Sequence, residues 1–570
     1  MRRFARVHGV WIAAVAAMLA ALAVPAAPAL AVPSTQYRGC DGYGAPSDAG
    51  DGMTEYADIL GIFNPPGYGT TARSDTYSGA PGVAACDQAL TDVPPAHWMR
   101  TVSLLRARAI HHLEAGETQP ALADLDLAQA AIKDPAEPYF ARSLGWGLEI
   151  VRAYATKKAG DRAKAETLAM AALAERPYTR QTLSAAFLAA EPGASEADED
   201  TILHGIARLV PEERTRLFAK ALRRGQFADA VALYPLLSPP YDPGIDSASA
   251  MVRNVQDLRN TQKADIFRAY TAGEYAYALA VLGRDDLARV TIAGARDTLT
   301  QATAPPPPAF DPNDDTEVRT QALTATMRAK TLAAASPLID QWSTLVEDRL
   351  AVNAGKAAEV FKSFQATPLP GTWAATELME AVAAKMPRGR KPLVINAITQ
   401  PTAADSDPTN ALFKILPEPE SPGRVPKYEE ATKPFFAMTG SQADRDTEGW
   451  RVREADGVTT VGFRGVKSTN SIVEEMALLR VAELAKEKGK TGFIVTARHD
   501  TKFAINTTYY GQTLRTDPDG YQTEFDVLFV DLAALPPQYA SESWLAFNAD
   551  EVYAALAPMY LPKTDGNKKD

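Results

Sequence analysis

The stretch Val151–Pro177, VRAYATKKAGDRAKAETLAMAALAERP, predicts two short helices joined at Gly160 and ended by the final proline. Ala153, Ala165 and Ala172 stand where the two helices approach each other, since a larger side chain would push them apart. Glycine permits the reversal between the helices because it adopts left-handed backbone conformations at little cost. We therefore predict a helical hairpin.

The same glycine and alanine spacing occurs at two other places in the chain. The three sets are Ala109, Gly116, Ala121 and Ala128; Ala153, Gly160, Ala165 and Ala172; and Ala276, Gly283, Ala288 and Ala295. A degenerate fourth set has Phe218, Gly225, Ala230 and Leu237, and Gly355 marks an incomplete fifth. Each pair leaves an apolar face that a neighbouring pair must cover, so the pattern predicts stacked helix pairs.

These sets resemble tetratricopeptide repeats over residues 96–385. The resemblance implies antiparallel helix pairs in a stack that offers a surface to a protein or peptide. The intervals are irregular, because Gly116 and Gly160 are 44 positions apart against a family period of about 34. We therefore expect a mainly α-helical protein whose repeats form an irregular α-solenoid, followed by a small α+β domain.

The N-terminus predicts export. Arg2 and Arg3 precede an apolar run at 10–24, and Ala29–Ala31 has the small residues of a cleavage site, so residues 1–31 are typical of a signal peptide. The apolar run is shorter than the roughly 20 residues of a spanning helix, which disfavours the alternative of a retained anchor. We expect a periplasmic or secreted protein without a transmembrane segment after cleavage behind Ala31; the general and the twin-arginine export routes both stay open.

Cysteine usage agrees with export. The chain has two cysteines, Cys40 and Cys86, in a Gly- and Pro-rich segment that we expect to be loops. An oxidising compartment would let them pair, and the bridge would order a segment with few apolar residues. Two buried free thiols are the alternative, and the wide spacing disfavours a redox-active pair.

Composition shifts divide the rest of the chain. The expected parts are a loop-rich segment at 32–95, helical repeats at 96–303, a Pro-rich spacer at 304–316, further helices at 317–390, a Pro-rich linker at 391–430, the α+β domain at 431–562 and a disordered tail at 563–570.

The C-terminal domain combines alternating strands with one amphipathic helix. We expect five strands from Trp450 onward, a helix at 469–488, and a hairpin turn at Asp517–Gly520 between the last two strands. In the helix, Ile472, Met476, Leu479, Ala482 and Leu484 form the apolar face, and Glu474, Glu475, Lys486 and Glu487 are expected to face water.

Within this domain, Val461–Val495, VGFRGVKSTNSIVEEMALLRVAELAKEKGKTGFIV, resembles a small α+β domain of bacterial envelope lipoproteins whose function is uncharacterised. The resemblance implies a fold and an envelope location but no reaction. The lipidated cysteine of that family is missing, so a lipid anchor is not implied.

A search for catalytic patterns is negative. The net charge of −11 argues against a nucleic-acid surface, and no zinc-protease, serine-hydrolase or phosphate-loop motif occurs. Adjacent helix positions point about 100° apart, so His111 and His112 should not chelate one ion. His499–Asp500 beside Arg480 and Glu483 is the best polar cluster. We assign no catalytic, metal or cofactor-binding residue and expect no cofactor.

The sequence therefore favours an exported scaffold that binds a protein or peptide partner. Two alternatives stay open: an envelope assembly factor, peripherally associated, whose C-terminal domain docks on an outer-membrane partner, and an enzyme with its site between the helical and α+β domains.

Overall fold

The computed structural model describes residues 34–46, 76–190, 195–238, 250–301, 316–366, 372–387, 412–432, 447–455, 457–466, 468–509 and 512–561. The chain divides into two compact units, Met1–Pro135 and Ala136–Asp570. The predicted signal peptide and C-terminal tail, and nearly all of the predicted spacer, lie outside the described residues. Within those ranges, no helix is long and apolar enough to cross a membrane.

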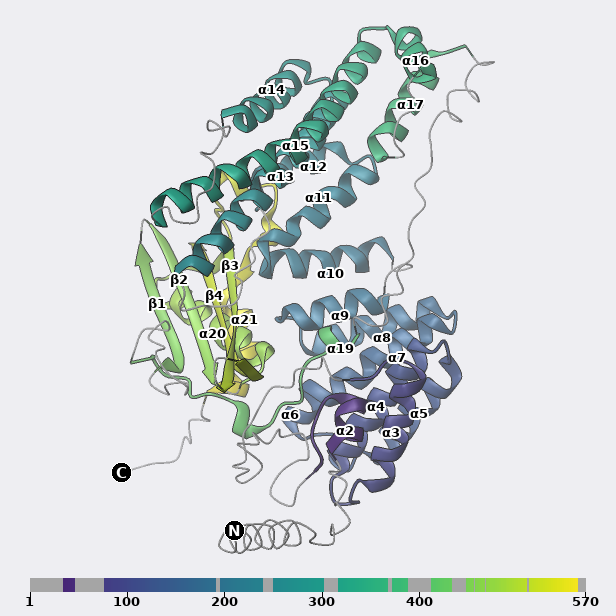
Figure 1. Cartoon of the computed structure of the whole chain (residues 1–570), viewed down its shortest axis with the longest axis vertical. Helices are drawn as coiled ribbons and strands as arrows, with labels where there is room; N and C mark the ends of the chain where they lie inside the picture. Colours follow the sequence, from purple (N-terminus) through teal and green to yellow (C-terminus); the bar gives the residue numbers. More distant parts are fainter. Residues whose placement is uncertain are drawn as a thin grey trace, which may run out of the picture. The chain divides into compact units, whose positions relative to one another are not determined.

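The first unit contains the helices α2 (Ser34–Asp41), α3 (Ala80–Asp92), α4 (Trp98–Glu114) and α5 (Thr118–Ala131) (Figure 1). Helix α4 contacts the other three, and its residues Val102, Leu104, Ala109 and Ile110 are fully buried. The centre of this unit is therefore α4.

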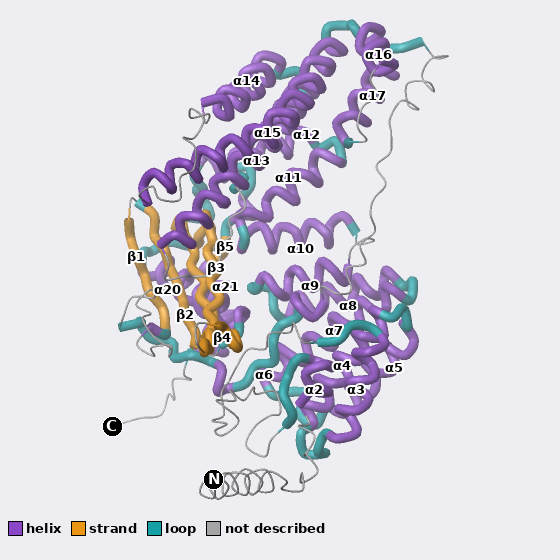
Figure 2. The backbone as a smooth tube through the Cα atoms, in the orientation of Figure 1, coloured by secondary structure: helices purple, strands orange, loops and turns teal. Residues whose placement is uncertain are grey.

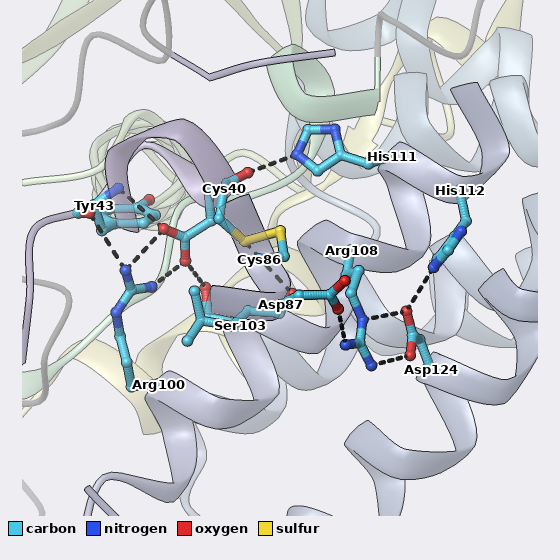
Figure 3. The surroundings of a disulfide bond; sticks show 12 residues. Cys40, Tyr43, Cys86, Asp87, Arg100, Ser103, Arg108, His111, His112 and Asp124 are labelled. Carbon is cyan, nitrogen blue, oxygen red and sulfur yellow. Dashed lines mark hydrogen bonds and ion pairs between the residues drawn. A yellow bond between two sulfur atoms is a disulfide. The ribbon is translucent and has the colours of Figure 1, made fainter. Parts of the chain in front are cut away.

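A disulfide bond joins Cys40 to Cys86, as predicted (Figure 3). The two cysteines lie on helices α2 and α3, so the expectation that loops carry them is wrong; residues 47–75 between these helices lie outside the described residues. Helix α2 has only 8 residues, too few for a stable isolated helix. The bridge holds this short helix on the unit.

A buried ion pair holds α2 as well. Arg100 on α4 donates from Nη2 to Oδ1 of Asp41 at 2.9 Å, and its guanidinium carbon lies 5.2 Å from the ring centre of Tyr37. Ser103 donates to the same carboxylate at 2.8 Å. Because Asp41 is satisfied by two α4 side chains, its burial is compatible with folding.

The second unit begins with a long series of helical elements. They are α6 (Pro138–Phe140), the π-helical turn η2 (Ala141–Gly145), α7 (Trp146–Lys158), α8 (Arg162–Glu175), α9 (Arg180–Ala190), α10 (Glu196–Leu209), the 3₁₀ turn η3 (Pro211–Glu213), α11 (Arg214–Arg223), α12 (Phe227–Leu233), the 3₁₀ turn η4 (Tyr234–Leu236), α13 (Ala250–Val281), α14 (Asp285–Gln301), α15 (Thr316–Asn353), α16 (Ala357–Ala366) and α17 (Trp373–Lys385).

Each glycine of the predicted repeats ends a helix in the left-handed conformation. Gly116, Gly160, Gly225, Gly283 and Gly355 all have φ between 72° and 98°. The amide that follows each glycine bonds back to a carbonyl five residues earlier, as Asp161 N does to Thr156 O at 3.2 Å. This is the Schellman arrangement, which satisfies carbonyls that the helix end leaves open.

The helices on the two sides of each glycine contact one another. The contacting pairs are α4 with α5, α7 with α8, α11 with α12, α13 with α14, and α15 with α16. Ala109, Ala121, Ala153, Ala165, Ala276 and Ala288 are all 0% exposed, and Ala172 is 6% exposed. Ala295 is only partly buried against the core of its pair.

An aromatic core holds α13, α15 and α17 together. Trp342 lies directly over Gly273, where a Cβ atom would be 2.2 Å from its ring. The hydroxyl of Tyr277 donates to Ala374 O at 3.0 Å. The ring centres of Trp373 and Trp342 lie 6.0 Å apart. Gly273 is required at this position because it lets the indole reach the helix backbone.

The C-terminal part forms an antiparallel sheet with the order β1-β2-β4-β3-β5 (Figure 2). Its strands are β1 (Gly449–Ala455), β2 (Val458–Val466), β3 (Gly492–Tyr509), β4 (Gln512–Val530) and β5 (Phe547–Asn548); the remaining elements are α19 (Leu412–Ile415), η7 (Pro422–Arg424), α20 (Asn470–Glu487), η9 (Pro537–Tyr539), η10 (Ser543–Leu545) and α21 (Ala549–Tyr560). Helix α20 contacts β1 to β4. The protein is thus mainly helical with a C-terminal five-stranded sheet.

The predicted hairpin turn at Asp517–Gly520 is wrong. These residues lie inside β4, where Asp517 pairs with Ile505 and Gly520 with Phe503. The register shifts between Phe503 and Ala504, so the extra residue is absorbed as a bulge. Aspartate, proline and glycine serve a bulge as well as a turn, and the reversal falls instead between Tyr509 and Gln512.

Overpacking at one helix contact should test the close approach of α7 and α8. We expect Ala165→Leu to lower the free energy of unfolding by about 1–3 kcal/mol, because the buried site has no room for the larger side chain. Ala163→Leu is the matched control, since Ala163 is exposed on the same helix. Urea unfolding measures both, and equal midpoints for the two variants would show that the contact is not tight.

Candidate functional site

A cluster of buried charged side chains in the second unit centres on two adjacent glutamates of α20. Glu474 is 0% and Glu475 1% exposed, so the prediction that both face water is wrong. The apolar face of α20 packs on the sheet, and its other face packs on the helical series. A helix covered on two sides buries residues that a one-sided amphipathic pattern assigns to solvent.

Glu475 is held by two arginines and a tyrosine. Arg176, just after α8, donates from Nε to Oε1 at 3.0 Å and from Nη2 to Oε2 at 2.8 Å. Arg142 of η2 also pairs with this carboxylate, and Tyr560, the last residue of α21, donates its hydroxyl at 2.5 Å. Bidentate pairing between a guanidinium and a carboxylate fixes both the position and the orientation of the two side chains.

A second carboxylate balances the two arginines. Glu420, in the segment after α19, lies 2.8 Å from Arg176 Nη2 and is fully buried. Burial raises the pKa of Glu420 against the effect of the arginines, whereas for Glu475 burial is outweighed by Arg176 and Arg142, so its pKa is lowered. The four charged groups therefore form a compact, paired set.

Glu474 makes a separate network with the sheet and α9. Its two carboxylate oxygens accept the backbone N–H of Arg180 at 3.0 Å each, and Arg498 of β3 pairs with it. Arg498 also donates to Asp500 at 2.8 Å. Burial raises the pKa of Glu474 although Arg498 opposes it. Together the two glutamates fasten α20 to η2, α8, α9 and β3.

Arg214 fastens β3 to the helices without any carboxylate. Its guanidinium donates to Val495 O at 2.7 Å, to Leu236 O at 3.2 Å and to Ala207 O at 3.3 Å. Burial lowers its pKa to about 10. A buried cation that only backbone carbonyls satisfy acts as a clamp and offers no free group to a ligand.

The predicted cluster of His499, Asp500, Arg480 and Glu483 does not form. Neighbouring residues of a strand face opposite sides of a sheet, and Asp500 pairs with Arg498 while Arg480 pairs with Glu483 at 3.0 Å. His499 instead faces Asp526, with Nε2 3.9 Å from Oδ2. The interaction with Asp526 raises the pKa of His499 and lowers that of Asp526.

The other conspicuous histidines have structural partners. His111 is fully buried, with Nε2 2.7 Å from Cys40 O and Nδ1 3.0 Å from Glu114. His112 lies 2.6 Å from Glu117. No group of three or more His, Cys, Asp and Glu side chains in the described ranges is arranged to hold a metal ion.

The outer face of α14 is a surface that sequence reasoning missed. On α14, Val290 is 67% and Leu287 45% exposed, and Leu282, between α13 and α14, is 38% exposed. On the opposite side of the helix, Ala288 and Ile292 enter the core shared with α13 and α15. Exposed apolar side chains gathered in one place mark interaction surfaces, whereas isolated ones do not.

No family model, curated protein or solved structure matches this chain. The likeness to tetratricopeptide repeats and to the envelope lipoprotein domain therefore stays a prediction.

Removing one charge from the Glu475 network should destabilise the second unit. We expect Glu475→Gln to cost about 3–5 kcal/mol, because the two arginines lose a buried counter-charge. Glu487→Gln is the control on the same helix: its carboxylate is 55% exposed and pairs with Arg480, so its loss should cost under about 1 kcal/mol. Urea unfolding that gives similar values for the two would contradict the assignment.

Glu274 of α13 should make stability depend on pH. It is buried, accepts a hydrogen bond from Trp373 Nε1 at 3.1 Å, and burial raises its pKa from 4.5 to about 7. Between these values the folded protein retains a proton that the unfolded chain releases, so stability falls as pH rises through this range, by about 3 kcal/mol in total.

The Glu274→Gln variant should lack this contribution. Urea unfolding near pH 5 and near pH 7.5 measures it as the difference between the two proteins. Identical pH dependence in the parent and in the variant would refute the assignment to Glu274.

Proposed function

We propose that this chain is an exported helical-repeat scaffold that binds a protein or peptide partner and catalyses no reaction. The observation that carries the proposal is the exposed apolar pair on the outer face of α14, formed by Leu287 and Val290. Those side chains are not part of the core that α14 shares with α13 and α15, so the cost of their exposure to water is offset when a partner covers them.

The helix pairs support the same proposal. Each pair that ends in a left-handed glycine buries small residues at its contact, and such pairs are suited to stacking in an irregular solenoid. The disulfide between Cys40 and Cys86 fits an oxidising compartment, periplasmic or extracellular. No cofactor is part of the proposal.

The two alternatives have weaker support. The assembly-factor alternative needs a free docking face on the C-terminal part, and α20 does not supply one because it is covered by the sheet and by Arg142 and Arg176. The enzyme alternative rests on the pair of His499 and Asp526 at 3.9 Å. An imidazole beside a carboxylate can accept a proton, but the other oxygen of Asp526 accepts the hydroxyl of Thr460 at 2.6 Å, so a purely structural role explains the pair equally well.

Site-specific photo-crosslinking tests the proposal. A photoreactive amino acid replaces Gly294, which is exposed on α14 and where a Cβ atom meets nothing within 4 Å. In envelope extract of the source organism we expect one or a few discrete protein adducts. The double variant Leu287→Glu with Val290→Glu should reduce the yield of these adducts by about tenfold or more, because it removes apolar contact.

The control places the same photoreactive group at Ala163, which is exposed on α8. Adducts that form equally at both positions, or that the double variant leaves unchanged, would contradict the proposal. Turnover in a panel of hydrolase substrates that His499→Asn abolishes would favour the enzyme alternative.

A further inference from the structure

We propose that the outer face of α14 binds a basic amphipathic helix, with apolar side chains against Leu287 and Val290 and with Lys or Arg side chains at Asp286 and Asp297. This inference rests on the proposed function and names the chemistry of the partner.

The position of each residue around α14 follows from its helical spacing. Ala288, Ile292 and Leu299 form the buried side. Val290 points away from them, and residues 286, 294 and 297 lie on the same side as Val290, because positions three, four and seven apart share one face of a helix. We call residues 286, 290, 294 and 297 the α14 ridge; Leu287 lies at its edge. The exposed ridge therefore carries a valine, a glycine and two aspartates.

The arginines of α14 are turned toward α15. Arg296 lies 2.7 Å from Asp340, and Arg289 lies 3.6 Å from Glu347. Both positions are on the flank of the helix, about 100° from Val290 or more. The side chain of Asp286 is fully exposed. Its Oδ1 lies 3.9 Å from Nη1 of Arg289, so the two groups form only a long ion pair. The charged side chains of the ridge itself are thus both acidic, while the half-exposed arginines on the flank pair with carboxylates of α15.

The spacing of the acids sets the length of the partner. Asp286 and Asp297 are eleven residues apart, or about 16 Å along the helix. A partner helix with three turns of apolar residues between two basic positions spans this distance. Close approach is open at Gly294, where a Cβ atom would meet nothing within 4 Å.

Charge also excludes two other occupants. A second copy of this chain placed face to face would bring Asp286 and Asp297 against the same acids, and like charges across an interface are unfavourable. An acidic amphipathic helix meets the same repulsion. A helix that carries Lys or Arg beside its apolar face is complementary to both features of the ridge.

Calorimetric titration with two designed peptides tests the inference. The full chain without its predicted signal peptide is titrated with an 18-residue amphipathic helix of leucine and lysine, and with the same peptide carrying glutamate in place of lysine. We expect the lysine peptide to bind at least about tenfold more tightly than the glutamate peptide, and more weakly as salt is raised. Asp286→Lys with Asp297→Lys should reverse this preference.

Leu287→Gln with Val290→Gln removes apolar contact without adding charge, and it should weaken the lysine peptide by about tenfold or more. Val458→Gln should leave the binding unchanged, since Val458 is a similarly exposed apolar residue, 41% exposed, on β2. Equal binding of the two peptides, an unchanged preference after the charge reversal, or an equal effect of Val458→Gln would overturn the inference. A crosslink at position 294 without binding of the lysine peptide would overturn the partner class and leave the scaffold function standing; failure of both would overturn both.

Discussion

The pairing of Glu475 with Arg176 is the contact on which the second unit depends. The two side chains are 299 positions apart in the chain, and both are 1% exposed. Removing such charges from water costs several kcal/mol each, and only paired, hydrogen-bonded partners offset that cost. Arg142, Glu420 and Tyr560 complete the set, so helices, linker and C-terminal helix meet at one paired cluster. The second unit therefore joins the sheet to the helices and does not leave it on a free linker.

The local features of this fold could be predicted from the sequence because their interactions are local. Gly160 ends a helix through bonds that reach back only five residues, and Thr469 accepts the N–H of Ile472 at the start of α20, three residues away. The disulfide was predictable for a different reason, since a chain with two cysteines and a predicted signal peptide has one intramolecular pairing open to it.

The distant contacts could not be predicted, and the errors follow from that. Helical periodicity assigned Glu474 and Glu475 to solvent because one apolar face already accounted for the sheet. Nothing near them in sequence shows that Arg142 and Arg176 cover the other face. The segment at Asp517–Gly520 failed similarly: the residues suit a turn, but pairing with β3 continues through them, and the strand opposite decides between turn and bulge. The His499 cluster failed because neighbours in a strand diverge.

The charge balance of the chain bears on both the buried cluster around Glu475 and the surface of α14. The chain has 59 basic and 70 acidic residues, and several arginines are engaged within the second unit: Arg142, Arg176 and Arg498 with α20, and Arg289 and Arg296 with α15. Arginine suits these positions because its planar fork pairs with carboxylates at low hydration cost. Each buried pair removes one positive and one negative charge from the surface, so the net charge of −11 stays on the exposed side chains. The exposed side of α14 carries part of this acidic excess in Asp286 and Asp297, and that excess is the reason why we propose a basic partner.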